Sequence, residues 1–149
     1  MTNLEPLSPG EVLVDEDGNE LLFRQMTSSM LEGKTPSSLA FAPQASDHRK
    51  PSFARGSKTT AQASRDWHTS NARQPSMGVW ACSVGEVQEI ESRAIDDCEV
   101  PRPPDEKVSP GHCYVDYRNL SKNEKKILQG FLLAKALDRQ EIPTTSSVG

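Results

Sequence analysis

A short apolar segment that leads directly into a helix start is the feature that most constrains this fold. Residues 78–95 read GVWACSVGEVQEIESRAI, and strand-favouring types are concentrated at 79–82. Ser83 and Glu86 then have the spacing of a capping box, in which each residue accepts the backbone N–H of the other. The segment therefore predicts a strand followed at once by a capped helix.

Other strands are indicated by short apolar runs next to turn residues. Residues 12–14 and 21–23 flank the pair Asp17-Gly18, which favours a tight turn and predicts a hairpin. Residues 37–41 predict a further short strand. Residues 112–117 predict another, in which Cys113, Val115 and Tyr117 share one side because side chains alternate along a strand.

Two more helices are predicted, and together with the strands they set the fold class. Residues 59–72 have a helix-start spacing, and residues 121–139 begin with the capping-box pair of Ser121 and Glu124. The elements alternate irregularly, without a repeated strand-helix-strand unit. The sequence therefore predicts an α+β fold with a single small mixed or antiparallel sheet, two or three helices and long loops.

The apolar side chains of the last predicted helix lie on two faces. We expect the core stripe to contain Ile127, Leu128, Phe131 and Ala134. Leu133 and Leu137 lie off that stripe. A second apolar face is explained either by internal packing or by a protein partner, including a second copy of the chain.

The composition indicates one modest core with loose extensions. The chain has 149 residues, of which 34% are hydrophobic and 5% aromatic, a low content for a chain packed from end to end. We expect a flexible lead-in at 1–10, a single domain at 11–139 with mobile loops near 44–58 and 99–110, and a disordered tail at 140–149.

Charge and hydropathy exclude several classes of protein. The net charge of -4 argues against a duplex nucleic-acid binder, which would carry a basic face. No apolar run approaches the length of a membrane span, and the first residues do not resemble a signal peptide. Cys82, Cys98 and Cys113 form no CxxC pair. We therefore expect a soluble, cytoplasmic protein without a membrane partner.

Common catalytic and cofactor signatures are absent from the sequence. It contains no GxGxxG, Walker, HExxH or GxSxG motif and no Cys/His zinc pattern. The histidines His48, His68 and His112 are far apart and have no ligand spacing. We therefore expect no metal site and no cofactor, and a protein that is not an enzyme.

One catalytic alternative places a thiol nucleophile at Cys82. This residue lies where the predicted strand becomes a helix, and a helix N-terminus favours the thiolate. His112 would be the base if the two strands paired. The competing interpretation is a buried Cys82 that only fills the core.

A second alternative is an ADP-ribosyltransferase-like or other nucleotide-binding or NAD-binding enzyme. Arg24, Ser38 and Glu86 occur in the chain order used by such folds. Arg24 would hold a phosphate, Ser38 would brace the nicotinamide pocket, and Glu86 would stabilise the ribosyl cation. A Glu86 that serves only as a helix cap is the competing interpretation.

A third alternative is nucleic-acid binding through the basic loop at 47–58. The loop carries His48, Arg49, Lys50, Arg55 and Lys58. Single-stranded nucleic acid is bound by cations interleaved with aromatic rings, and Phe53 is the aromatic residue of this loop. A solvated loop explains the same charges.

The segments LLFRQM, SSLAFAP, GVWACSVGE and HCYVDY occur in that order and precede a lysine-rich helix. The pattern resembles a family of small bacterial, actinobacterial proteins with FRQ, SSxAFxP and GVWxxxVGE segments. The resemblance extends from residue 21 to residue 137 and implies a single-domain unit without implying an activity. It makes the following residues candidates for a common site: Arg24, Gln25, Ser37, Ser38, Phe41, Pro43 and Asp47.

The leading interpretation is a small accessory protein that acts through protein-protein contacts. It depends on the absent catalytic motifs and on the second apolar face at Leu133 and Leu137. The predicted partner is another protein or a second copy of the chain, bound through the helix at 121–139. A nucleotide-binding or NAD-binding enzyme remains the principal alternative.

Overall fold

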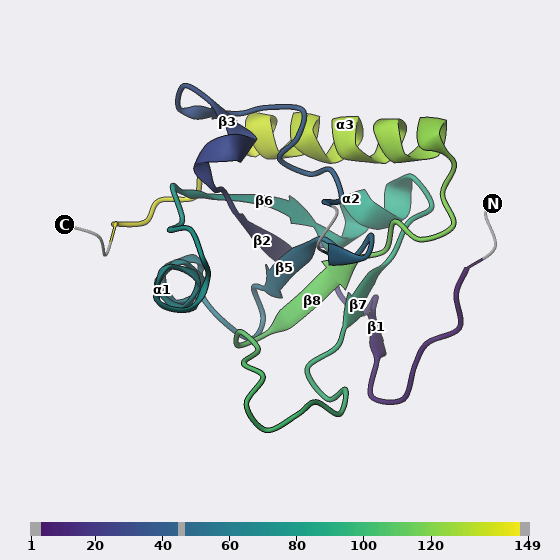
Figure 1. The fold of residues 1–149 in the computed structure, drawn as a ribbon. Coiled ribbons are helices and arrows are strands. Elements are labelled where there is room, and N and C mark those ends of the chain that lie inside the picture. The colour runs from purple at the N-terminus through teal and green to yellow at the C-terminus, as the bar shows by residue number, and fades with distance from the viewer. Residues whose placement is uncertain (1–3, 45–46, 147–149) are drawn as a thin grey trace.

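A six-stranded antiparallel sheet forms the centre of the computed structural model, which describes residues 4–44 and 47–146 (Figure 1). The strand order is β1-β7-β8-β5-β2-β6. The predicted α+β class with an antiparallel sheet is therefore confirmed. The strands are β1 (Val12–Val14), β2 (Leu21–Gln25), β5 (Ser52–Arg55), β6 (Val79–Ser83), β7 (Ala94–Asp96) and β8 (His112–Val115).

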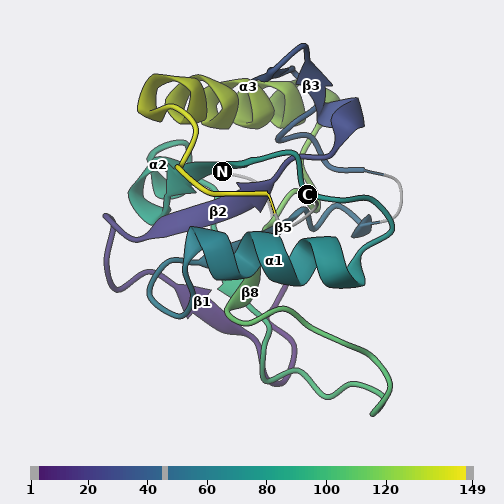
Figure 2. The ribbon, with the colours of Figure 1, turned by 90° about the vertical axis from the view of Figure 1, so that its left-hand side faces the viewer.

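Helices cover both faces of the sheet (Figures 1 and 2). The helix α1 (Ala61–Asn71) lies on one face, and α2 (Val84–Glu89) and α3 (Lys122–Arg139) lie on the other. A 3-10 turn η1 (Ser28–Met30) and a small hairpin of β3 (Leu31–Glu32) and β4 (Thr35–Pro36) accompany α3. No helix in the described part of the chain is long and apolar enough to cross a membrane.

Side-chain alternation divides the core between the two faces of the sheet. Leu22 and Cys82 belong to the larger cluster, which α3 closes with Leu128, Leu132 and Ala136. Phe23 and Ala81 point to the opposite face and pack with α1. The predicted common side of Cys113, Val115 and Tyr117 is confirmed in the larger cluster.

Both predicted capping boxes are present. The Glu86 N–H donates to Ser83 Oγ at 3.1 Å, and the Ser83 N–H donates to Glu86 Oε1 at 2.8 Å. Ser121 and Glu124 form the same pair of bonds at the start of α3. The predicted strand-to-helix unit is therefore confirmed, but α2 ends at Glu89 because the residues from 94 onward form β7.

The predicted hairpin between residues 12–14 and 21–23 is wrong. β1 pairs with β7, whereas β2 lies inside the sheet between β5 and β6. The turn itself forms, since the Glu20 N–H donates to the Asp17 carbonyl at 3.1 Å. However, the Gly85 N–H donates to the Gly18 carbonyl at 2.8 Å, so this turn packs on α2 and does not close a hairpin.

Two other predictions about local structure require correction. Residues 37–41 form turns and not a strand, with the Ala40 N–H donating to the Ser37 carbonyl. The predicted helix at 59–72 is α1, but its cap is Thr60, whose hydroxyl accepts the Ala63 N–H at 3.1 Å. The end of the basic loop, at 52–55, forms β5.

The described part of the predicted disordered tail is packed against the fold. The Ile142 N–H donates to the Val79 carbonyl at 2.8 Å, and Arg65 Nη1 donates to Thr144 Oγ1 at 2.8 Å. The Thr145 N–H donates to Gln62 Oε1 at 2.8 Å. The tail therefore joins α1 to the edge strand β6, and residues 147–149 lie outside the described residues.

The buried stripe of α3 differs from the prediction. Leu128, Leu132 and Ala136 are buried, whereas Ile127 is 57% exposed. A spacing of four residues keeps side chains on one helix face, and this explains why the stripe passes through 128, 132 and 136. Leu133 is partly buried against the larger cluster.

Candidate functional site

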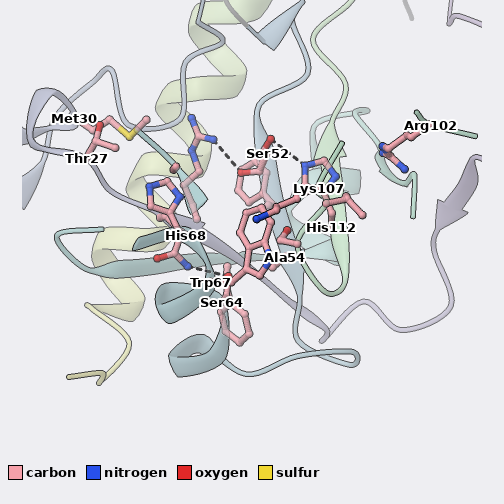
Figure 3. Close-up of a pocket in the computed structure, with 17 residues that line it drawn as sticks. Thr27, Met30, Ser52, Ala54, Ser64, Trp67, His68, Arg102, Lys107 and His112 are labelled. Atoms are coloured by element: carbon pink, nitrogen blue, oxygen red, sulfur yellow. Dashed lines mark hydrogen bonds between the residues drawn. The ribbon is translucent and has the colours of Figure 1, made fainter. Parts of the chain in front are cut away.

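A cleft lies at the carboxyl end of β2, bounded by α1, η1 and the connector at 97–111 (Figure 3). It consists of two adjoining hollows with volumes of about 390 Å³ and about 860 Å³. We call both together the Arg24 cleft. The residues that line both hollows are Arg24, Thr27, Met30, Ser52, His68 and Ala72.

Arg24 is a buried cation held by carbonyl groups. Its side chain lies within the fold, with the residue only 6% exposed. Nε donates to the Ala40 carbonyl at 3.0 Å, and Nη1 donates to the Ser52 carbonyl at 2.9 Å. The guanidinium also lies 5.4 Å from the centre of the Phe53 ring. These contacts fix its position without neutralising its charge.

The charge of Arg24 is only partly compensated. Within residues 4–44 and 47–146, no carboxylate forms an ion pair with it. Burial lowers the pKa of Arg24, and the negative charge of Asp47 acts in the opposite direction. Burying a cation without a paired anion is costly, so this arrangement favours a site that receives an anion.

Further cations surround Arg24. Arg102 and Lys107 line the smaller hollow, and Arg73 lines the larger one. Asp47 lines the larger hollow, and no other acidic residue of the described chain lines either hollow. The Arg24 cleft is therefore positive although the whole chain carries a net charge of -4.

A chain of hydrogen bonds crosses the smaller hollow from the sheet to the connector. Ser52 Oγ lies 3.0 Å from His112 Nε2, and His112 Nδ1 lies 2.6 Å from Asp97 Oδ1. The other oxygen of Asp97 lies 3.2 Å from Arg102 Nη2. Ser52 is on β5, His112 begins β8 and Asp97 follows β7, so neighbouring strands of the sheet bring the three groups together.

The helix α1 supplies one wall of the Arg24 cleft. Figure 3 shows Trp67 and His68 of α1, Ser52 and His112 of the sheet and Lys107 of the connector around one space. His68 Nε2 is buried and has no hydrogen-bond partner among the described residues. Burial lowers the pKa of His68, which favours the neutral ring.

Gln25 also lines the cleft, and two serines fix its side chain. Its amide nitrogen donates to Ser64 Oγ at 2.9 Å, and its amide oxygen accepts from Ser76 Oγ at 2.7 Å. Both bonds join the end of β2 to α1 and the segment after it. This network positions the wall that carries Trp67.

The predicted thiol site does not form. Cys82 lies on β6, and β5 and β2 separate that strand from β8 and His112. The two side chains also lie on opposite faces, because Cys82 belongs to the cluster under α3. Burial raises the pKa of Cys82 to about 12. The structure therefore supports the alternative interpretation of Cys82 as a core residue.

Arg24, Ser38 and Glu86 do not share a cavity. Arg24 pairs with Trp80 across the sheet, whereas Ser83, the cap next to Glu86, pairs with Leu21. A separation of three residues along a strand corresponds to about 10 Å. The Glu86 carboxylate is occupied by its cap and by Arg139, whose Nη2 lies 2.9 Å from Oε2.

Ser38 and Ser37 lie in the turns that follow β4, outside the Arg24 cleft. The Ser38 carbonyl accepts a hydrogen bond from Gln129 of α3 at 3.1 Å, and Ser37 Oγ accepts the Leu39 N–H at 3.2 Å. Phe41 is fully buried in the larger core cluster. These three candidates therefore have structural contacts, whereas Arg24, Gln25, Asp47 and His112 line the cleft.

The basic loop does not form a single positive surface. Arg55 and Lys58 bind Asp96, with Nη1 and Nζ both 2.8 Å from Oδ2. Lys50 lies over the Tyr114 ring at 5.3 Å. These cations contact Asp96 and the Tyr114 ring and do not form one continuous positive surface. The loop therefore offers little support for nucleic-acid binding.

Several residues of the cleft were not among the sequence candidates. They are Ser52, Trp67, His68, Asp97, Arg102 and Lys107. The sequence contains no motif that would group them. Comparisons with protein-family models, curated proteins and solved structures give no match to this chain. No group of His, Cys, Asp or Glu suited to a metal ion occurs within the described ranges.

Proposed function

We propose that the Arg24 cleft binds a small organic anion, with a carboxylate or phosphate group placed against Arg24. The observation that carries this proposal is the buried guanidinium, which binds the carbonyls of Ala40 and Ser52 and, among residues 4–44 and 47–146, no carboxylate. A guanidinium with two N–H groups fixed is already oriented for an anion, so little conformational freedom is lost on binding.

The remainder of the ligand is expected to lie in the smaller hollow. Its volume of about 390 Å³ matches the lower range of small-molecule sites. Trp67 offers an aromatic surface, and Lys107 adds a positive charge. A ligand with an anionic group and a planar or apolar part would fit this volume, contact the Trp67 ring and pair with Lys107. Nucleotides are one class of such ligands.

The protein-interaction function has weaker support. It depended on Leu133 and Leu137 as a second apolar face of α3. Leu133 packs against the larger core cluster, and Leu137 is 39% exposed. A single exposed leucine beside polar residues does not form an apolar patch. We therefore give the Arg24 cleft priority.

The test is a thermal-shift and fluorescence titration of the full chain. The probes are inorganic phosphate, pyrophosphate, citrate, ADP and NAD. A ligand that binds only the folded state raises the unfolding midpoint. Because Trp67 lines the cleft, a bound anion should also change tryptophan emission, and this change should be absent in Trp67→Phe.

Two variants make the test specific. Arg24→Met removes the charge and keeps an unbranched side chain of similar length, and should abolish the shift. Lys126→Met removes a positive charge from an exposed site on α3 and should leave the shift unchanged. If no probe binds, or if Arg24→Met binds as well as the wild type, the proposal is wrong.

A further inference from the structure

We propose that Ser52 is a nucleophile and that the Arg24 cleft hydrolyses carboxylic esters that carry an anionic group. This inference rests on the proposed anion binding and adds a reaction to it. Two hydrogen bonds support it. Ser52 Oγ lies 3.0 Å from His112 Nε2, and His112 Nδ1 lies 2.6 Å from Asp97 Oδ1. A nucleophile, a base and an orienting carboxylate have this order of contacts.

The hydrogen-bond partners define the roles of the two ring nitrogens of His112. The carboxylate of Asp97 can only accept from Nδ1, so Nδ1 carries the proton and Nε2 is left as the acceptor. Nε2 therefore faces the Ser52 hydroxyl as a base. Arg102 holds the second oxygen of Asp97 through Nη2 at 3.2 Å and fixes the carboxylate beside Nδ1. Asp97 is thus a positioning residue.

The exposure of Ser52 supports a chemical role over a structural one. Ser52 is exposed, whereas the side chains of His112 and Asp97 are only 20% and 15% exposed. Water would satisfy an exposed hydroxyl, so the fold has no need of a bond between Ser52 and His112. The hydroxyl lies at the surface of the cleft and is accessible to a ligand there.

Ser52 also joins the reacting group to the anion site. Its hydroxyl contacts His112, and its backbone carbonyl accepts from Arg24 Nη1 at 2.9 Å. A substrate with its negative charge near Arg24 would therefore place a nearby ester carbonyl at Ser52 Oγ. This geometry selects a short ester with the charge a few bonds from the carbonyl carbon.

The reaction follows from these positions. Ser52 Oγ attacks the ester carbonyl carbon while His112 Nε2 takes the hydroxyl proton. The carbon–oxygen bond to the alcohol then breaks, and His112 returns the proton to the departing alcohol, leaving an acyl group on Ser52. Water attacks this acyl group, its proton passes through His112 to Ser52 Oγ, and the acid is released. The net change is ester plus water to acid plus alcohol.

A positive charge is available for the oxygen that becomes negative during the attack. Lys107 lines the same hollow, and no carboxylate in the described part of the chain forms an ion pair with it. Figure 3 shows Lys107 beside Trp67 and His112. Stabilisation of a developing oxyanion in a partly enclosed site is a large part of catalysis by such groups.

The first test compares two chromogenic esters of similar length on the full chain. Mono-p-nitrophenyl succinate carries a carboxylate, and p-nitrophenyl butyrate is neutral. We expect hydrolysis of both, with kcat/KM at least about 10-fold higher for the succinate because a charge-assisted contact with Arg24 is added. Arg24→Met should lower kcat/KM for the succinate until the ratio between the two esters is about one.

Variants then identify the reacting residues. Ser52→Ala and His112→Ala should each lower kcat/KM by about 1000-fold or more. Asp97→Asn should lower kcat and leave KM unchanged, and Asp97→Glu should recover part of the rate. Ser38→Ala is the matched control, because Ser38 is exposed and lies in the turns that follow β4, outside the Arg24 cleft.

A covalent probe provides a readout that does not depend on the substrate. A fluorophosphonate should add one label to the wild type at Ser52, detected by intact mass and peptide mapping. Ser52→Ala should not be labelled, and Ser38→Ala should be labelled at the wild-type rate. Each variant is checked for cooperative unfolding, so that a loss of labelling is not a loss of fold.

The outcomes separate this inference from the proposed function. If anions bind to the wild type and to Ser52→Ala, but no ester is hydrolysed and no probe reacts, the esterase is excluded and anion binding stands. If Ser52 is labelled but no anion binds and the two esters react equally, the proposed function is wrong. Hydrolysis that survives in Ser52→Ala overturns the inference directly.

Discussion

Arg24 and Arg55 lie on the paired strands β2 and β5, yet the fold treats their charges in opposite ways. Arg55 is surrounded by acids: Nε lies 3.0 Å from Glu20 Oε2, and Nη1 lies 2.8 Å from Asp96 Oδ2. Arg24 is more deeply buried and contacts only backbone carbonyls through its hydrogen bonds. The region around Arg55 is therefore a cluster of ion pairs, which we call the closed cluster. The region around Arg24, which we call the open region, retains a positive charge that no acid of the described chain pairs with.

This difference distinguishes a structural from a functional use of a buried cation. The ion pairs of the first region are formed within one cluster, which consists of Glu20, Arg55, Lys58 and Asp96. Its side chains connect β5 to β7 across the intervening strand β8. Arg24 has no acidic partner in the described part of the chain and faces a cleft. Unpaired buried charge is destabilising, and proteins retain it mainly where a ligand completes the site.

The largest expected effect is in the closed cluster. Arg55→Met leaves the buried carboxylate of Glu20 without its cation and leaves Asp96 with Lys58 alone. The expected loss is about 3–5 kcal/mol of unfolding free energy, the usual result of breaking a buried ion pair from one side. Urea denaturation followed by circular dichroism measures it. A loss below about 1 kcal/mol would mean that the cluster behaves as surface charge.

Arg24→Met is the matched change in the open region, and we expect a much smaller effect. The substitution frees two carbonyl groups but also removes a buried charge without an acid partner, so these terms oppose each other. The change in unfolding free energy should stay within about 1 kcal/mol in either direction. The same denaturation experiment measures it. A loss as large as that of Arg55→Met would remove the contrast between the two regions.

The two regions should also differ in acid. Burial disfavours the ionised forms of Glu20 and Asp96, but hydrogen bonds from Arg55 and from neighbouring groups outweigh it and lower the pKa of both carboxyls. Because the unfolded chain binds these protons more tightly, the stability they contribute is complete above the ordinary carboxyl pKa of about 4 and is lost below it.

The unfolding free energy of the wild type should therefore fall as the pH drops from about 5 to 2. The fall should be shallower in Arg55→Met, which has lost the main interaction that lowers the pKa of Glu20 and one of those that lower the pKa of Asp96, where Lys58 remains. Arg24→Met should fall as steeply as the wild type, because no carboxylate forms an ion pair with Arg24 within the described residues. Parallel curves for all three proteins would contradict this explanation.

The smallest effects are expected at the rims of the two regions. Lys58 is 47% exposed at its side chain and contacts Asp96, so Lys58→Ala should cost about 1 kcal/mol or less and leave anion binding unchanged.

Arg73 is exposed and lines the larger hollow of the cleft. Arg73→Ala should leave the unfolding midpoint unchanged while weakening anion binding by a few-fold, and its affinity should respond less to salt.

Much of the fold could be predicted where the signal is local. The two capping boxes at Ser83 and Ser121 involve residues three apart, and both formed as expected. The hairpin failed because strand pairing is a long-range choice. β2 finds better partners in β5 and β6, and the turn at Asp17-Gly18 packs against α2. The residues of a turn determine where the chain reverses direction. They do not determine which strands pair in the sheet.

The site was less predictable because its parts come from distant segments. Arg24 and His112 were candidates, but for different chemistry with different partners. Ser52 lies 60 residues from His112, and no motif links them. Strand order decides which residues meet, and the order β7-β8-β5 brings Asp97, His112 and Ser52 together. That order is not encoded in any short stretch of the sequence.

The bonds from the last described residues to α1 have a consequence for the order in which the protein is made. Thr144 and Thr145 hold Arg65 and Gln62 of α1, and Ile142 binds β6. A ribosome releases residues 142–146 long after it releases α1 and the central strands. The wall that carries Trp67 can therefore be locked in place only after residues 142–146 have left the ribosome, well after α1 itself has formed.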